Sequence, residues 1–237
     1  MKSREFTEMQ LSRRGLILGG AALAASCATS SNKSLVSVVM PPDLPPVGGT
    51  GEPITVAAAP KVVMDPNGVI RKPLLDGALA ALERHGERIP KRDAIFLVDF
   101  DRHSSKPRLY RLDMTTGHVE QFRTAHGRGS DPSHTGFAQR FSNTPDSNAS
   151  SVGAYVTAGM SSGAKYAENV LLDGLEDTNS KAMERAIIVH AADYAEPSYV
   201  AQHGKLGRSY GCFSLCQRDL AVLRPAMDKG RLLYAAA

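Results

Sequence analysis

The sequence predicts a single, mainly β domain with a few short helices. From residue 93 onward, short segments that are β-branched or alternate in polarity recur between turns, as expected for strands. Sustained helical periodicity is confined to two stretches. With 237 residues, of which 42% are hydrophobic and 22% charged, the chain can bury one good core.

The strands follow one another with few long gaps, and the tight connection TTG at 115–117 joins two of them as a hairpin. They are expected at residues 93–100, 108–114, 118–124, 152–160, 168–175, 185–191 and 230–236. The formal net charge of +4 is spread along the chain without a basic run. Nucleic acid is therefore not an expected partner.

Two helices are expected. The first follows Pro73 and ends near Gly86, because five apolar residues fall on one face at helical spacing: Leu74, Leu75, Ala78, Leu79 and Leu82. The second runs from about Gln217 to about Met227, where Pro225 should bend or break it.

Residues 1–27 are predicted to be a signal peptide, because a charged stretch precedes an apolar run from Gly15 to Ala25 and then small residues. The run is shorter than the roughly 20 residues of a membrane-spanning helix. The pair Arg13 and Arg14 resembles a twin-arginine signal, and an ordinary secretory signal explains it equally well. In both cases the protein is expected to be exported, to the periplasm or cell envelope.

Two interpretations of Cys27 stay open. Small residues before it resemble a lipoprotein processing site, which would attach the protein to a membrane, whereas cleavage after Ala28 would discard it. Residues 28–72, rich in proline, glycine and small residues, are expected to form an extended tether. The catalytic domain, with its N-terminal helix, is then expected at 73–237.

The segment GRSYGCFSLC at 207–216 carries two nearby cysteines, which fit a metal clip, a redox pair or a single nucleophilic thiol. Glycine lets the backbone of a tight turn approach a substrate, and a thiol attacks only as thiolate, so it needs a base or a positive charge nearby. His190, which ends an apolar strand, is the best candidate base.

The stretch from Arg185 to Leu215, RAIIVHAADYAEPSYVAQHGKLGRSYGCFSL, resembles the histidine-to-cysteine segment of YkuD-like L,D-transpeptidases. HGRGS at 126–130, FSNTPDSNASSVGAY at 141–155 and DGLEDTN at 173–179 extend the resemblance to the murein L,D-transpeptidase catalytic-domain branch. The resemblance implies an L,D-transpeptidase-like β-sandwich or barrel from about Asp93 to the end of the chain.

It also implies acyl transfer on peptidoglycan stem tetrapeptides, in cell-wall cross-linking or remodelling, without a cofactor or metal. Cys212 would attack the carbonyl before the terminal D-alanine and form a thioester, and an amine of a neighbouring stem would resolve it. His190 would act as base, Ser209 would orient it, and the N–H groups of Gly211 and Cys212 would stabilise the oxyanion.

Further residues are expected to bind substrate. Arg208 is a candidate for a substrate carboxylate, and Tyr210 stands where many family members have histidine, which bears on how that carboxylate is held. Of the remaining candidates, His126 follows one expected strand, and Ser151 and Gly153 lie at the start of another. Each also fits a purely structural role.

Four alternatives stay open. Water as acceptor would make the same acyl-enzyme an L,D-carboxypeptidase. A zinc site could use some of the neighbouring histidines, cysteines and Asp193, although structural zinc usually needs a second cysteine pair. A Cys212–Cys216 disulfide would silence the nucleophile. A non-enzymatic wall-binding protein would explain export but not the cysteine, histidine and serine.

Overall fold

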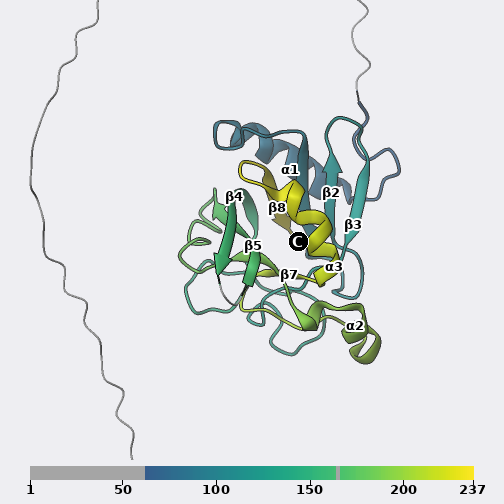
Figure 1. The fold of residues 1–237 in the computed structure, drawn as a ribbon, viewed down its shortest axis with the longest axis vertical. Coiled ribbons are helices and arrows are strands. Elements are labelled where there is room, and N and C mark those ends of the chain that lie inside the picture. Colours follow the sequence, from purple (N-terminus) through teal and green to yellow (C-terminus); the bar gives the residue numbers. More distant parts are fainter. Residues whose placement is uncertain (1–61, 164–165) are drawn as a thin grey trace, which may run out of the picture. The chain divides into compact units, whose positions relative to one another are not determined.

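The computed structural model describes residues 62–163 and 166–237. In this part of the chain eight strands form one sheet, and short helices occupy several connections (Figure 1). The strands are β1 (Ala94–Asp99), β2 (Leu109–Asp113), β3 (Val119–Phe122), β4 (Gly153–Gly163), β5 (Tyr166–Gly174), β6 (Ile188–Ala191), β7 (Phe213–Leu215) and β8 (Leu232–Ala236). The helices are α1 (Lys72–Arg84), α2 (Pro197–His203), α3 (Gln217–Leu223) and the 3₁₀ turns η1 (Gly86–Arg88), η2 (Asp193–Ala195) and η3 (Arg224–Met227).

The sheet has the strand order β3-β2-β1-β8-β4-β5-β6-β7. Two pairs of neighbours, β1 with β8 and β6 with β7, are parallel, and the others are antiparallel. The two edges approach each other, because the N–H of Ala125, just beyond β3, donates to the carbonyl of Ser214 in β7 at 2.8 Å. The sheet therefore forms a nearly closed barrel.

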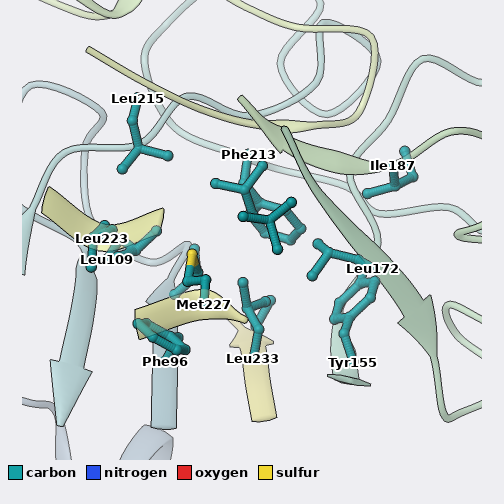
Figure 2. Packing of buried hydrophobic residues seen from close by; sticks show 14 of the residues in the cluster. Phe96, Leu109, Tyr155, Leu172, Ile187, Phe213, Leu215, Leu223, Met227 and Leu233 are labelled. Carbon is teal, nitrogen blue, oxygen red and sulfur yellow. The ribbon is translucent and has the colours of Figure 1, made fainter. Parts of the chain in front are cut away.

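The main core lies inside this curved sheet. Phe96 of β1, Tyr155 of β4 and Phe213 of β7 are fully buried in one cluster with Leu233 of β8, and Figure 2 shows their side chains converging. Met227 of η3 fills the same space. Burial of large apolar side chains from both ends of the sheet favours curvature over a flat sheet, because the apolar area leaves water only when the strands wrap around it.

α1 covers the other face of the sheet. Its buried residues Leu74, Ala78 and Leu82 pack with Ile95 and Leu97 of β1 in a second cluster, as the helical spacing predicted. α3 ends at Leu223, and the 3₁₀ turn η3 follows from Arg224, because Pro225 cannot continue the α-helical hydrogen bonds.

The mainly β fold with a few short helices is confirmed, and each expected strand overlaps an observed one, although β4 extends to Gly163 and β5 begins at Tyr166. The strand expected at 185–191 begins only at Ile188, since Ala186 has a positive φ of 51°. Two elements escaped the sequence analysis: the short strand β7, and α2, which begins at Pro197 and ends before the left-handed Gly204. Proline at a helix start and glycine after its end were the available signals for α2.

The predicted signal peptide and Cys27, together with the predicted tether up to residue 61, lie outside the described residues. The last part of the predicted tether packs on the domain. The carboxylate of Asp65 accepts the N–H groups of Val69 and Ile70, at 2.9 and 2.7 Å, and Ile70 is buried. The packed domain thus begins before residue 73. Within residues 62–163 and 166–237, no helix has the length and apolar character needed to cross a membrane.

Candidate active site

The site is built around a tight turn at residues 207–212, the cysteine turn, which leads into β7. Gly211 has a φ of 124°, and a Cβ at this position would lie 2.9 Å from the carbonyl oxygen of Ala149 and 2.7 Å from Cδ1 of Ile187. Only glycine avoids both the strained φ and the contact with a neighbouring backbone. The turn can therefore present Cys212 close to two neighbouring segments.

Two serine hydroxyls hold the cysteine turn. Ser209 Oγ donates to the carbonyl of Cys212 at 2.7 Å and accepts the N–H of Gly211 at 3.1 Å. Ser150 Oγ donates to the carbonyl of Gly211 at 3.0 Å and accepts the N–H of Gly127 at 2.9 Å. These bonds satisfy backbone groups of a buried turn and fix its conformation.

This arrangement corrects two expectations. Ser209 was expected to orient His190, but its hydroxyl is bonded within its own turn. The N–H of Gly211 was expected to face an oxyanion, but Ser209 Oγ accepts it. Short polar side chains in turns readily form hydrogen bonds to nearby backbone groups. The Ser209 hydroxyl therefore has its partners within the turn and needs no distant one.

Cys212 is a partly buried free thiol at the mouth of the turn. Its Sγ lies 3.5 Å from the carbonyl oxygen of Ala186. Burial raises the pKa of the thiol above its ordinary value of 9.0, whereas the N–H of Ile188 and the positive charge of Arg185 act in the opposite direction. At neutral pH the resting side chain is therefore a thiol, and it needs a base to become nucleophilic.

His190 has both ring nitrogens within hydrogen-bond distance of a partner. Nδ1 lies 2.8 Å from the carbonyl oxygen of Ala191, which can only accept, so Nδ1 carries a proton. Nε2 lies 3.0 Å from Ser214 Oγ. Burial lowers the pKa of His190 below 6.5, against the opposing effect of the Ala191 carbonyl. At neutral pH the imidazole is therefore uncharged, with its basic lone pair on Nε2.

The pairing of β6 with β7 brings the strand of His190 beside the cysteine turn. His190 pairs with Ser214, and Val189 pairs with Phe213, whose side chain points into the core. Cys212 immediately precedes β7, and the N–H of Ile188, two residues before His190, bonds to its sulfur. The arrangement thus combines a thiol at the end of the cysteine turn with a neutral imidazole on the neighbouring strand β6.

Arg185 supports this region from the segment before β6. Its guanidinium donates to the carbonyl oxygens of Ser142 and Ala149, at 2.6 and 2.5 Å, and it is half-buried. Its charge lowers the pKa of the Cys212 thiol. One side chain therefore fixes the loop that contacts Gly211 and supplies positive charge near the sulfur.

Residues 67–236 match the family model of the L,D-transpeptidase catalytic domain. The chain belongs to this family. The match includes the cysteine turn, His190 and the whole sheet, so the resemblance found in the sequence is confirmed. No curated protein matches the chain.

Solved structures of L,D-transpeptidases resemble the chain at low identity. One from Mycobacterium smegmatis is 13% identical over 61% of this chain and 59% of its own, with a TM-score of 0.38. L,D-transpeptidase 1 of Mycobacterium tuberculosis is 12% identical over 61% of this chain and 62% of its own, with a TM-score of 0.36. Another L,D-transpeptidase, from Mycobacterium tuberculosis H37Rv, is 16% identical over 61% of this chain and 58% of its own, with a TM-score of 0.39. The chain therefore spans about three fifths of these proteins.

His126 of this L,D-transpeptidase domain was expected to face the substrate, but it is buried, with 1% of its surface exposed. Nη2 of the fully buried Arg108 donates to its Nδ1 at 2.7 Å, and its Nε2 lies 3.4 Å from Asp131 Oδ2. Burial and the charge of Arg108 lower its pKa to about 3. Its carbonyl accepts the N–H of Ser209. The backbone of His126 thus holds the cysteine turn, and its neutral ring belongs to a buried hydrogen-bond network with Arg108 and Asp131.

Ser151 and Gly153 were also expected to bind substrate, and both are buried. Ser151 Oγ lies 2.7 Å from Tyr155 Oη, within the core. Gly153 starts β4 with a φ of 110°, and a Cβ there would meet side chains of Glu176 and Thr178. Their serine neighbour Ser150 is the residue of this segment that reaches the cysteine turn.

Arg208 and Tyr210 lie at the surface next to the thiol. Tyr210 is 67% exposed and borders two pockets of about 300 and 290 Å³. The first, which we call the arginine pocket, is lined by Arg128, His134, Tyr194, Tyr199, Gly207, Arg208 and Tyr210. Arg208 Nη1 donates to the carbonyls of Asp131 and Pro132, so the arginine also anchors a loop. Whether it binds a substrate carboxylate stays a prediction.

Cys212 and Cys216 are both free thiols. Cys216 is buried at the start of α3, with its carbonyl accepting the N–H of Leu220, so it packs behind the turn as expected. No group of three or more histidine, cysteine, aspartate or glutamate side chains in the described ranges is placed to hold a metal ion. His203 is exposed at the end of α2, with its ring centre 4.2 Å from that of Tyr199.

The sequence analysis missed Ser214, Tyr194, Ser150 and Arg185. Ser214 is a single serine in an apolar segment, a pattern that fits a purely structural residue equally well. The others occupy ordinary turn and loop positions, and nothing in their spacing indicates that they meet the cysteine turn or His190.

Proposed function

We propose that this chain is a cysteine-dependent peptidoglycan L,D-transpeptidase that acts on stem tetrapeptides through a thioester on Cys212. The observation that carries the proposal is the pairing of β6 with β7, which sets the strand of His190, in the tautomer with a basic Nε2, beside the cysteine turn. Membership of the L,D-transpeptidase catalytic-domain family supports the same reaction class.

In acylation, His190 takes the thiol proton as sulfur attacks the carbonyl between the third residue and the terminal D-alanine. The resting thiol and imidazole are both neutral, so charge separates only as the reaction proceeds. Arg185 favours the developing thiolate, because its charge lies close to the sulfur. The proton then goes to the amine of the departing D-alanine.

The N–H of Cys212 remains the backbone candidate for stabilising the oxyanion, now that Ser209 accepts the N–H of Gly211. In the second step an amine from a neighbouring stem peptide attacks the thioester, and His190 accepts its proton. Export by the signal predicted at residues 1–27, with or without a lipid on Cys27, would bring the enzyme to peptidoglycan.

The proposal is tested by incubating the protein with purified disaccharide-tetrapeptide and following protein and products by mass spectrometry. We expect a thioester on Cys212, release of D-alanine and cross-linked dimers. Cys212→Ala should form no adduct and no product, whereas Cys216→Ala, the matched control, should remain active. His190→Ala should lose at least about 100-fold in acylation rate.

The products also decide the acceptor. Tripeptide without dimer would identify a carboxypeptidase. A wild-type protein that folds but forms neither adduct nor product would reject the enzyme, and a normal rate in His190→Ala would move the base to another residue.

A further inference from the structure

A chain of hydroxyl groups links His190 to the arginine pocket. Nε2 of His190 lies 3.0 Å from Ser214 Oγ, and Ser214 Oγ lies 2.9 Å from Tyr194 Oη. Ser214 is fully buried on β7, whereas Tyr194 is half-buried on η2 and lines the arginine pocket. The catalytic imidazole is thus connected with a surface cavity whose lining includes Gly207, Arg208 and Tyr210 of the cysteine turn.

The chain can run in either direction. With Nδ1 protonated against Ala191, the Nε2 lone pair of neutral His190 accepts from Ser214, and Ser214 accepts from Tyr194. When Nε2 carries a proton, it donates to Ser214, which then donates to Tyr194. Serine and tyrosine hydroxyls both donate and accept, so rotation of two O–H bonds reverses the chain.

The other groups of the arginine pocket suit an anion. Arg128 is exposed, with its guanidinium 5.5 Å from the ring centre of Tyr210, and Arg208 also lines the pocket. Arginine binds carboxylates through two parallel hydrogen bonds. A volume of about 300 Å³ is suited to one amino acid. The pocket therefore offers positive charge for a carboxylate and, through Tyr194, a proton path for an amine.

We propose that the arginine pocket binds the amino acid released on acylation, a D-amino acid with a free carboxylate, and that Ser214 and Tyr194 carry the proton from His190 to its amine. This inference rests on the proposed function and adds to it the place of the leaving group. It also gives Ser214 the role of relaying the proton of His190, and Tyr194 the role of donating a proton to the leaving amine.

The step balances as follows. The S–H bond of Cys212 breaks and Nε2–H forms, while sulfur bonds to the carbonyl carbon. Nε2 then passes its proton to Ser214 Oγ, Ser214 passes its own to Tyr194 Oη, and Tyr194 passes its own to the leaving nitrogen as the C–N bond breaks. Each hydroxyl loses one proton and gains one. The carboxylate of the departing amino acid stays with Arg128 or Arg208.

Exchange of labelled D-alanine into unlabelled tetrapeptide tests this directly, because the label must enter through the leaving-group pocket. The carboxylate contact should appear in KM and the proton path in kcat. We expect Arg128→Gln to raise the KM for D-alanine about tenfold, the usual cost of a lost charged hydrogen bond. The same variant should bind D-alaninamide, which lacks the carboxylate, as well as wild type does.

Tyr194→Phe and Ser214→Ala should each lower kcat about tenfold at unchanged KM, and the double variant should lose no more than the worse single one, because both break one path. The wild-type solvent isotope effect should depend nonlinearly on the deuterium fraction, and linearly in Tyr194→Phe. Matched controls are Tyr234→Phe on β8 and the exposed Arg218→Gln on α3, both expected to behave as wild type.

A purely structural role for the chain would leave the isotope effect unchanged, and additive losses or a normal kcat in Tyr194→Phe would overturn the relay. Equal KM changes for D-alanine and D-alaninamide would overturn the carboxylate site. If Ser214→Ala fails to fold, Tyr194→Phe by itself still tests the proton relay. If the wild-type protein forms no thioester, D-alanine titration followed by NMR still tests the pocket, so failure of the proposed function is distinguishable.

Discussion

Gly211→Ala should destabilise the domain and displace the nucleophile. The φ of 124° lies where L-residues are strained, at a cost of about 1–3 kcal/mol. The new methyl group would lie 2.9 Å from the carbonyl oxygen of Ala149, and such overpacking costs about another 1–3 kcal/mol. Ile187 Cδ1 can rotate away, but the carbonyl cannot, because Arg185 holds it. The expected loss is about 2–6 kcal/mol.

Thermal unfolding measures this loss, at roughly 2–4 °C per kcal/mol for a domain of this size, and the rate of Cys212 alkylation by iodoacetamide reports the displacement of the thiol. Gly204→Ala is the matched control. Gly204 also has a positive φ, of 69°, but its added Cβ would meet nothing within 4 Å, so it should cost only about 1 kcal/mol and leave alkylation unchanged. Equal effects of the two substitutions would refute the argument from Ala149.

Three further predictions concern titrating groups. The acylation rate should hold as pH falls through 6.5 and drop only below it, because the base is neutral His190 and burial lowers its pKa; a midpoint above 6.5 would contradict this. Stability should fall by about 1.4 kcal/mol per pH unit between pH 6.5 and about 3, since unfolding lets His126 bind a proton that the folded state excludes. When the free energy of unfolding is measured with urea at several pH values, it should change less steeply with pH in His126→Gln than in the wild type. Arg185→Gln should shift the pH dependence of Cys212 alkylation to higher pH, because it removes a charge that lowers the thiol pKa. Arg185→Lys keeps a positive charge and should shift it less. Equal shifts in the two variants would show that the charge of Arg185 is not the cause.

The sequence alone was enough to predict the mainly β fold, the helix α1 and the pairing of a cysteine turn with a strand-ending histidine. These features depend on local patterns: polarity that alternates along strands, apolar residues at helical spacing, and glycine before the cysteine. They also carry the family resemblance, and the family match over residues 67–236 confirms it.

The tertiary structure decided which side chains face the thiol. His126, Ser151 and Gly153 stand next to expected strands in the sequence, where a cleft position was plausible, yet packing buries all three. Ser214 and Tyr194, 20 residues apart, meet because β7 pairs in parallel with β6 beside η2. Periodicity shows which residues can share a face of one strand, but strand register and loop packing determine contacts between distant segments. That is why the sequence could identify Cys212 and His190 as candidates but not the hydroxyl groups between His190 and the arginine pocket.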